Sequence, residues 1–486
     1  MSFLAVTATL AVLLLLLRAK RRVCIDVPLV HSDAPLAARL QSGYAQHKGR
    51  VFKLRCPHGE QLVLPSAHVE ELKLLPKSTI SFAQSLIDVC RVLAFARSPA
   101  DMSQQFWGNQ TLIGHHDETL VARLLADCFA AAVVADMRDE LAYAMPAALP
   151  QHKEWTPFQA HPAVLRIVAL LSGRVFVGQA LSRNEEFLNC IVMYTIDSFS
   201  ASTRLYDVHP LLRPFARFFL PELQSVRRHV ATMKRLVKPL VEERLRKGAD
   251  APNDMVSWNL EHSPSALRTD VDYQALQQLQ ASFAAVHTTA LLLTNIIFDL
   301  AARPEYIQPL REEVQTALDA DDGVITKATM SKLVKMDSFM AEVQRFNPPG
   351  IMTFNRATTG PVTLSDGLHL PKGTWLAAPS SQIAMDPEIW DEPTKFDGFR
   401  FERLRQRQGM SGRYQFVSTG PDMLLFGYGN QACPGRFFVS NEIKLILATL
   451  LLEYELKLPG DRPDTIINEV SVRPDSQKEV LIRRRA

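Results

Sequence analysis

The sequence predicts a mainly α-helical protein with a small β region. Apolar residues recur at three- and four-residue spacing across most of residues 115 to 345, for example in residues 226 to 246, which is the periodicity of amphipathic helices. At residues 347 to 350, NPPG, this pattern stops because proline cannot continue a helix. Short runs of Val, Ile and Thr broken by DG and PKG follow in residues 351 to 380, which is typical of strands and turns.

Length and composition are compatible with one large domain after a short N-terminal segment. The chain has 486 residues, of which 47% are hydrophobic and 22% are charged, and its formal net charge is +3. This balance argues against nucleic-acid binding, which needs a concentrated basic surface. The six cysteines are scattered without C-x-x-C spacing, which indicates neither a disulfide framework nor a cysteine-rich zinc site. No repeat or Gly/Ser linker divides residues 23 to 486, so we expect a single domain there.

Residues 1 to 22 have the composition of a membrane anchor. Residues 3 to 17 are almost wholly apolar, and RAKRR follows directly. The apolar run is short for a bilayer span, although flanking residues can extend it. A cleaved signal peptide is the alternative, but the charges follow the apolar run instead of preceding it, and no small-x-small cleavage site is present. The charges predict a single-pass anchor with the remaining chain on the cytoplasmic side.

A long buried helix is expected in the middle of the domain. Residues 273 to 302 contain neither Gly nor Pro, and their second half is apolar on nearly all sides. His287, Thr288 and Thr289 interrupt this apolar stretch. A hydrogen bond from the Thr288 hydroxyl to the Ala284 carbonyl would loosen the helix, and such irregularities often mark functional sites. The alternative is a core helix with a satisfied histidine and two self-bonded threonines.

A Glu-x-x-Arg step precedes the NPPG motif. Glu342 and Arg345 share one helical face and can pair. Most such pairs are exposed and contribute little to stability. Apolar neighbours on this helix suggest burial, and a buried pair needs further hydrogen-bond partners to offset its desolvation. Arg400, in the segment FDGFRF, is a candidate third member that would connect the helical body to the segment before Cys433.

Cys433 has an unusual setting, because residues 426 to 438 read FGYGNQACPGRFF. The glycines permit positive φ or close approach of the backbone to a bulky flat group. Pro434 favours a helix start after the cysteine, where free N–H groups would favour a thiolate. A nucleophile, a redox thiol and a metal ligand are all compatible with this setting. A nucleophile would need a histidine and a redox thiol a second cysteine, and neither lies nearby, so a thiolate ligand of haem iron fits best.

The Cys433 loop resembles the haem-binding loop F-x-x-G-x-[R/H]-x-C-x-G of the cytochrome P-450 monooxygenases. Three other segments follow the order of that family. Residues 284 to 289, AAVHTT, are similar to its oxygen-binding groove [A/G]-G-x-[D/E]-T-[T/S], EVQR at 342 to 345 matches its E-x-x-R, and FDGFRF supplies the arginine partner. The resemblance spans roughly residues 25 to 486 and implies the cytochrome P-450 fold, with the long central helix crossing the haem.

The resemblance implies roles for the residues of the loop. Cys433 would be the axial thiolate ligand of a haem b group, with Phe426 packed beside the sulfur. Gly429 and Gly435 would permit the loop conformation. Gln431 departs from the family, which usually has Arg or His there facing a haem propionate. Its presence implies that other basic residues hold the propionates or that haem binding is weaker.

Outside the loop, the resemblance gives Thr288 the delivery of protons for oxygen activation, with Thr289 beside it in the groove motif. His287 is a second departure, because the family has an acid there, and we hypothesise that its imidazole relays protons. Arg356, after the E-x-x-R helix, is expected to contact a haem propionate. Three residues would be structural and hold the cysteine loop in place: Glu342, Arg345 and Arg400.

The implied activity is that of a haem-thiolate monooxygenase whose catalytic domain is residues 23 to 486. It would insert one oxygen atom from O2 into a bulky hydrophobic substrate, using NADPH-derived electrons from a flavoprotein, the NADPH-cytochrome reductase. The HTT variant and the CPGRFF ending resemble filamentous-fungal members that oxidise terpenoids and related secondary metabolites. The anchor at residues 1 to 22 implies the endoplasmic reticulum membrane, with the catalytic domain cytoplasmic.

Two alternatives are open. One is a haem-thiolate enzyme that uses peroxide or isomerises its substrate without a reductase, and Thr288 argues against it because such an enzyme needs no proton delivery to O2. The other is a non-catalytic, membrane-anchored protein that binds haem or a lipophile. The presence of Cys433, Thr288 and the E-x-x-R step argues against that second alternative.

Overall fold

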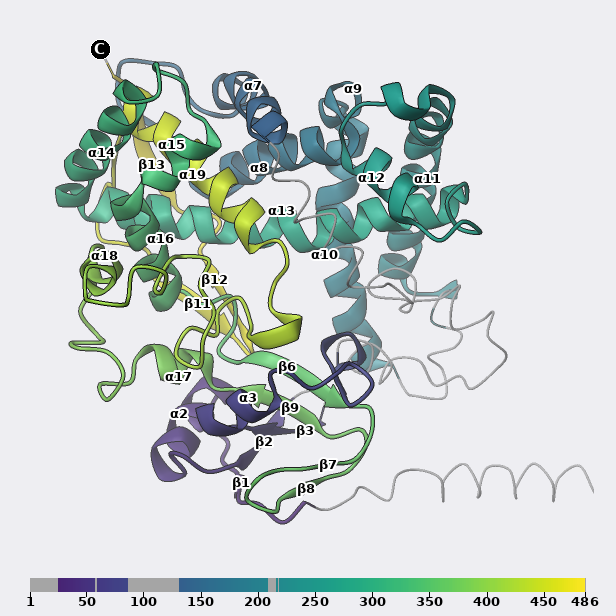
Figure 1. The fold of residues 1–486 in the computed structure, drawn as a ribbon, viewed down its shortest axis with the longest axis vertical. Coiled ribbons are helices and arrows are strands. Elements are labelled where there is room, and N and C mark those ends of the chain that lie inside the picture. Colours follow the sequence, from purple (N-terminus) through teal and green to yellow (C-terminus); the bar gives the residue numbers. More distant parts are fainter. Residues whose placement is uncertain (1–24, 57–58, 86–130, 209–215, 217, 486) are drawn as a thin grey trace, which may run out of the picture.

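The computed structural model describes residues 25–56, 59–85, 131–208, 216 and 218–485. The predicted anchor, residues 1 to 22, lies outside these described residues. Figure 1 shows a large helical part around the long helix α13 and a smaller β-rich part below it. The prediction of a mainly α protein with a small β region is therefore confirmed.

Helices account for most of the described chain. In the helical part they are α7 (Ala131–Ala148), α8 (Ala160–Val177), α9 (Gln179–Ser182), α10 (Glu185–Asp207), α11 (Pro221–Lys247), α12 (Met255–His262), α13 (Val271–Ala302), α14 (Ile307–Asp319), α15 (Lys327–Lys332), α16 (Val334–Phe346) and α19 (Arg436–Glu453). Nearer the β-rich part are α2 (Leu36–Gln46), α3 (Ser66–Leu72), α17 (Ser380–Ala384) and α18 (Arg400–Arg405).

The principal sheet has six strands in the order β1-β2-β3-β9-β6-β4. Its strands are β1 (Leu29–Val30), β2 (Phe52–Cys56), β3 (Gly59–Val63), β4 (Ile80–Ser81), β6 (Thr353–Thr358) and β9 (Trp375–Ala378). The strands predicted after residue 350 are present, and they pair with strands from the N-terminal region. In particular β4, at one edge, is antiparallel to β6, with Ile80 opposite Thr358.

Three smaller sheets complete the β structure. They consist of β5 (Thr156–Gln159) with β13 (Glu479–Arg484) and β10 (Tyr454–Lys457), β11 (Thr465–Asn468) with β12 (Ser471–Pro474), and β7 (Val362–Thr363) with β8 (His369–Leu370). The first of these sheets belongs to the helical part, because Phe158, Leu456 and Ile482 lie in its core.

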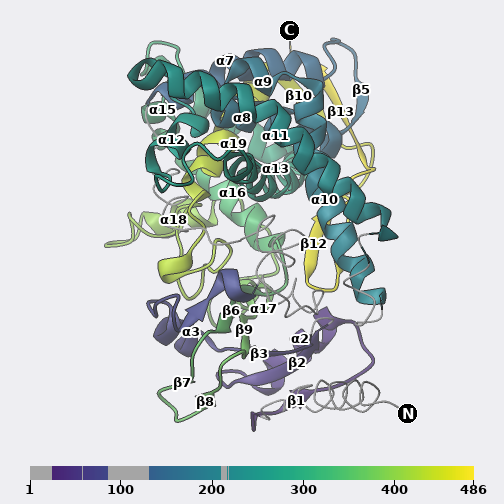
Figure 2. The same ribbon diagram turned by 90° about the vertical axis from the view of Figure 1, so that its right-hand side faces the viewer.

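Helix α13 runs through the middle of the helical part in both views (Figures 1 and 2). Asp270 caps its N-terminus by accepting hydrogen bonds from the backbone N–H groups of Asp272 and Tyr273. The helix continues without interruption to Ala302. The expected hydrogen bond from Thr288 to the Ala284 carbonyl is present at 2.7 Å, but it does not break the helix.

Two described helices, α8 and α13, are long and apolar enough to cross a membrane by length and composition alone. In their most apolar windows, 67% and 61% of the residues are buried within the protein. Their apolar character is therefore explained by packing in the core.

Candidate active site

The Cys433 loop joins a short 3-10 turn, Gly429–Gln431, to helix α19. The Cys433 N–H donates to the Phe426 carbonyl at 2.7 Å and closes the loop. The Phe426 ring packs edge-on against Phe416, with 5.2 Å between ring centroids. Helix α19 begins at Arg436, slightly later than Pro434 suggested. The loop thus presents Cys433 just before a helix N-terminus, as predicted.

The sulfur of Cys433 receives hydrogen bonds from the backbone N–H groups of Gly435 and Arg436. Burial nevertheless raises the pKa of the Cys433 thiol, and these two N–H groups and the Arg436 charge oppose that effect without cancelling it. The N–H groups at the start of α19 thus act in the expected direction, toward a thiolate, but desolvation acts against them and is the larger effect. A coordinated metal ion supplies the positive charge that deprotonates such a thiol.

Two glycines of the loop have positive φ, namely Gly427 at +73° and Gly429 at +72°. A Cβ atom at Gly429 would lie 2.1 Å from the Lys73 carbonyl oxygen. Asn430 donates its backbone N–H to the same carbonyl at 3.0 Å. Gly429 is therefore needed where the loop meets the chain beyond α3. Gly435 has an ordinary φ of −80°, so its conformation does not require glycine.

Helix α13 leaves one part of its surface open. Two residues one turn apart are exposed, namely Ala284 and Thr288. Val286, which lies between them in the sequence, and Thr289, which follows them, are buried. Because the Thr288 hydroxyl donates its proton to the Ala284 carbonyl, its oxygen can still accept a hydrogen bond from the open side. An exposed turn in an otherwise buried helix is a surface on which a large flat group can pack.

Aromatic side chains connect α13 to α10 at Phe283, five residues before Thr288 on the same helix. Phe283 stacks on Phe199 of α10, with 5.3 Å between ring centroids, and Tyr194 meets Phe283 edge-on at 6.3 Å. Phe199 is 62% exposed and Ile196, on the same helix, is also exposed. Among the described residues, Phe283, Phe199 and Ile196 therefore form an exposed apolar surface where α10 meets α13.

The side chains of His287 and Thr289 do not face the open turn. The His287 Nε2 atom lies 3.0 Å from the Val192 carbonyl oxygen of α10, so this nitrogen carries a proton and donates it. Burial lowers the pKa of His287. Thr289 is fully buried. Successive helical residues differ by about 100° in direction, which separates both side chains from that of Thr288.

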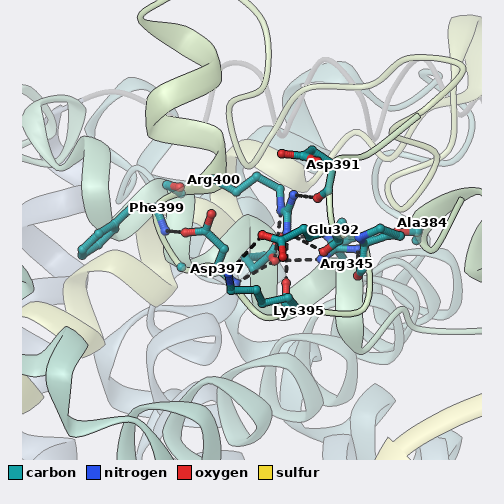
Figure 3. A network of polar contacts seen from close by, with 12 residues as sticks. Arg345, Ala384, Asp391, Glu392, Lys395, Asp397, Phe399 and Arg400 are labelled. Atoms are coloured by element: carbon teal, nitrogen blue, oxygen red, sulfur yellow. Dashed lines mark hydrogen bonds and ion pairs between the residues drawn. The ribbon is translucent and has the colours of Figure 1, made fainter. Parts of the chain in front are cut away.

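Glu342, Arg345 and Arg400 form the predicted network (Figure 3). Arg345 donates to both carboxylate oxygens of Glu342, each at 2.8 Å, and Arg400 Nε donates to one of them at 3.2 Å. Glu342 also accepts the backbone N–H of Asp397 at 3.0 Å. All three charged side chains are buried. The carboxylate therefore has the additional partners that a buried ion pair requires.

The two arginines of this network also bind backbone carbonyls of the segment before the cysteine loop. Arg345 donates to the carbonyls of Ala384 and Pro393 at 2.6 and 2.8 Å. Arg400 donates to three carbonyls, those of Asp391, Glu392 and Lys395. These contacts fix the course of residues 384 to 400 relative to helix α16.

Arg356 and Gln431 are in contact, although they are far apart in the sequence. The buried Arg356 donates to the Gln431 carbonyl at 3.1 Å. The Gln431 side chain accepts the Phe82 backbone N–H at 2.8 Å and donates to the Ile80 carbonyl at 3.2 Å. The sequence analysis did not predict these two partners of Gln431, which are Ile80 in β4 and Phe82 directly after it. Among the described residues, no group of three or more His, Cys, Asp or Glu side chains could hold a metal ion.

A profile of the cytochrome P450 family matches residues 129–482. The chain belongs to the cytochrome P450 family. This cytochrome P450 is 37% identical over 455 residues to cytochrome P450 monooxygenase ORF5 of Penicillium roqueforti, which covers 92% of this chain and 82% of the relative. It is 37% identical over 471 residues to cytochrome P450 monooxygenase BOA4 of Botryotinia fuckeliana, which covers 95% and 91%. It is accordingly a monooxygenase.

The fold agrees with a solved structure, the retinoic acid-bound cyanobacterial CYP120A1. The TM-score is 0.69 at 17% sequence identity, and the match covers 95% of this chain and 100% of that one. At this identity the likeness shows the fold alone.

The family implies a haem-thiolate cofactor, and the described residues of this cytochrome P450 fit one. The open turn at Ala284 and Thr288 interrupts an otherwise buried helix, which is what a flat macrocycle needs. The loop from Phe426 to Arg436 is largely only half-buried, although it is anchored on both sides. Cys433 would ligate the iron. Phe426 would pack beside the sulfur, and Arg356 is a basic residue that β6 brings to the loop from a distant part of the chain.

Proposed function

We propose that this cytochrome P450 inserts one oxygen atom from O2 into a bulky apolar substrate of fungal secondary metabolism, with terpenoids as the first class to test. The observation that supports this proposal most strongly is the exposed apolar surface that Phe199 and Ile196 of α10 form with Phe283 of α13, the helix that carries Thr288. Such a surface binds a substrate mainly by burying hydrocarbon and offers few polar groups to orient it. The names of the fungal relatives support a monooxygenase reaction.

Thr288 is the proposed proton-delivering residue. Its hydroxyl oxygen faces the open turn and keeps acceptor capacity there, because its proton is bonded to Ala284. A water molecule held by this oxygen could pass a proton toward the site where oxygen is activated. The haem would supply the oxygen chemistry through an iron ligated by Cys433. His287 is bound to α10 and has a lowered pKa, so we assign it a positioning role in place of the proton relay.

The proposal includes a structural network, an electron donor and a membrane anchor. Glu342, Arg345 and Arg400 hold the segment that leads to the cysteine loop. Electrons would come from NADPH through a membrane-bound flavoprotein reductase. Residues 1 to 22 would anchor the enzyme in the endoplasmic reticulum membrane, with the catalytic domain, residues 23 to 486, in the cytoplasm.

The first experiment asks whether the protein carries haem with a thiolate ligand. The reduced protein with carbon monoxide should give the difference spectrum of a haem-thiolate centre. Cys433→Ser should abolish that spectrum. Cys190→Ser should retain it, because Cys190 is a buried cysteine of α10 that contacts α11. Loss of the spectrum in both variants, or in neither, would refute the assignment of Cys433.

The second experiment tests the reaction. With a flavoprotein reductase, NADPH and isotopically labelled O2, a terpenoid panel should yield products that carry one labelled oxygen atom. Labelled product formed from labelled peroxide without NADPH would instead indicate a peroxide-using enzyme. A normal carbon-monoxide spectrum without turnover of any apolar substrate would favour a binding protein.

A further inference from the structure

Gln431 stands where its family usually has a cationic residue, and its side chain is fully engaged elsewhere. The carboxamide oxygen accepts the Phe82 N–H at 2.8 Å, and the carboxamide nitrogen donates to the Ile80 carbonyl at 3.2 Å. The assignment of the oxygen and nitrogen is fixed by these partners, since a backbone N–H must meet an acceptor and a carbonyl must meet a donor.

These two contacts reproduce the hydrogen bonding of a parallel β-strand. In a parallel pair, one residue donates its N–H to the C=O of residue j−1 on the neighbouring strand and accepts the N–H of residue j+1 of that strand at its own C=O. Here the carboxamide bonds the C=O of Ile80 and the N–H of Phe82, which flank Ser81. Strand β4 is the edge of the six-stranded sheet, so among the described strands none pairs with its outer side. The side chain of Gln431 takes the place of that missing strand.

The inner side of β4 confirms which groups face outward. Strand β6 lies antiparallel to β4, with Ser81 opposite Ala357, and Thr359 donates its N–H to the Thr79 carbonyl at 2.8 Å. Because the groups of alternate residues point to opposite sides of a strand, Thr79 and Ser81 bond inward to β6. The C=O of Ile80 and the N–H of Phe82 then point away from β6, toward Gln431.

Strand β6 also binds the same loop residue. Arg356, within β6, donates to the main-chain carbonyl of Gln431 at 3.1 Å. The side chain of Gln431 is thus attached to β4 and its backbone to β6, and the two strands are paired with each other. These contacts form a closed ring that holds the loop at a corner of the sheet, two residues before Cys433.

We propose that Gln431 is a positioning residue that docks the Cys433 loop onto edge strand β4, because its carboxamide takes the place of the N–H and C=O of one residue in a parallel strand. At neutral pH a carboxamide of this length offers a coplanar donor and acceptor side by side. Arginine has no acceptor, and a neutral histidine carries its donor and acceptor on different sides of the ring. The docking therefore replaces the cation that the family usually places here. This inference goes beyond the proposed function, because it does not depend on the substrate.

Hydrogen exchange in the haem-loaded enzyme tests the docking directly. Gln431→Met keeps the length of the side chain but removes both hydrogen bonds, so the Phe82 amide should exchange about tenfold faster or more. The matched control is Asn430→Ala, which removes a neighbouring loop contact, to the Leu74 carbonyl. This control should leave Phe82 exchange unchanged. Unchanged Phe82 exchange in Gln431→Met, or equal acceleration in both variants, would overturn the proposal.

Gln431→Arg separates docking from a simple role in holding haem. Arginine can still donate to the Ile80 carbonyl but cannot accept from Phe82, so Phe82 exchange should accelerate as in Gln431→Met. Transfer of haem to an excess of an apo-globin acceptor should also become faster. If Gln431 merely fills the place of a haem-facing cation, Gln431→Arg would slow haem transfer and leave Phe82 protected, and that result would refute the proposal.

Gln431→Glu gives a signature that a general packing role would not produce. A carboxylate can accept from Phe82 but faces the Ile80 carbonyl without a proton, whereas a protonated carboxyl can donate to that carbonyl. The Phe82 protection and the Tm of this variant should therefore approach wild-type values as pH falls. Gln431→Met should show no such recovery. Identical pH profiles for the two variants would contradict the carboxamide pairing.

Discussion

The hydroxyl of Ser172 in α8 donates a hydrogen bond of 2.9 Å to the carboxyl group of Glu442 in α19. Neither side chain has access to solvent. Burial raises the pKa of Glu442 to about 8, and the hydrogen bond from Ser172 only partly opposes this rise. The group is therefore mostly protonated at neutral pH, and helix α19 carries a neutral carboxyl group in the core.

This buried carboxyl should make the protein less stable as pH rises. The unfolded chain loses the Glu442 proton near the ordinary pKa of 4.5, whereas the folded protein keeps it to about 8. Between these values the folded state binds more protons, so the free energy of unfolding falls with rising pH. Glu442→Gln should remove this part of the slope and be more stable than wild type at about pH 8. Urea unfolding of the two haem-loaded proteins at a series of pH values between 4.5 and about 8 measures the free energy of unfolding. The same pH dependence in Glu442→Gln and in wild type would contradict the prediction.

A second prediction concerns the buried carboxylate of Glu342. Glu342→Ala leaves Arg345 and Arg400 buried without their shared partner, which should cost about 3–5 kcal/mol in the free energy of unfolding. The same substitution should accelerate haem release, because the segment before the cysteine loop loses its attachment. Lys395→Ala removes an exposed ion pair with Glu392 in that segment and should cost at most about 1 kcal/mol. Similar losses for both variants would contradict the assigned role of the network.

Substitutions of Thr288 and Thr294 should have opposite effects, with Thr288→Val affecting catalysis and Thr294→Val affecting stability. Thr288→Val removes a hydroxyl that is bonded within the helix on the open turn, so the free energy of unfolding should change by less than about 1 kcal/mol. The fraction of consumed NADPH that appears as product should fall about tenfold or more. Thr294, buried on the same helix, bonds Ala290 and His161. Thr294→Val should lower stability and leave coupling intact, and the reverse pattern would refute the assignment of Thr288.

His161, whose pKa is lowered by burial, should make the protein less stable at acid pH. Burial, and secondly the charge of nearby His287, lower the pKa of His161 from 6.5 to about 4. The unfolded chain therefore binds a proton below about pH 6.5 that the folded protein does not bind until about pH 4. Stability should decline as pH falls through this window. His161→Asn should make the decline shallower, whereas His31→Asn, at an exposed position, should leave it unchanged.

Much of the fold and site could be predicted where local pattern determines the outcome. The long helix, the break after Phe346 and the strands that follow depend on periodicity and on proline, which act over a few residues. The contact between Glu342 and Arg345 follows from helical spacing. That His287 and Thr288 point in different directions could also have been predicted, because adjacent residues on a helix cannot share one face.

The rest depends on contacts between distant parts of the chain. Gly429 is required by the carbonyl of Lys73, and Gln431 is paired with Ile80 and Phe82, so the reason for either residue lies outside its own segment. Nothing in the local pattern near Ile80 indicated an edge strand that would receive a side chain. The effect of burial on the pKa of Cys433 could not be predicted for a related reason, because the sequence shows the helix N-terminus but not the degree of desolvation.

The pairing of Leu62 in β3 with Leu376 in β9 has a consequence for synthesis on the ribosome. Strands β1 to β3 emerge early, but their sheet cannot close until β6 and β9 have been translated, and the cysteine that follows comes later still. During most of translation the nascent chain therefore carries unpaired strand edges, which are prone to aggregation. Cofactor loading must wait for nearly the last part of the polypeptide, so expression yield should depend on haem supply at the end of synthesis and on chaperones before it.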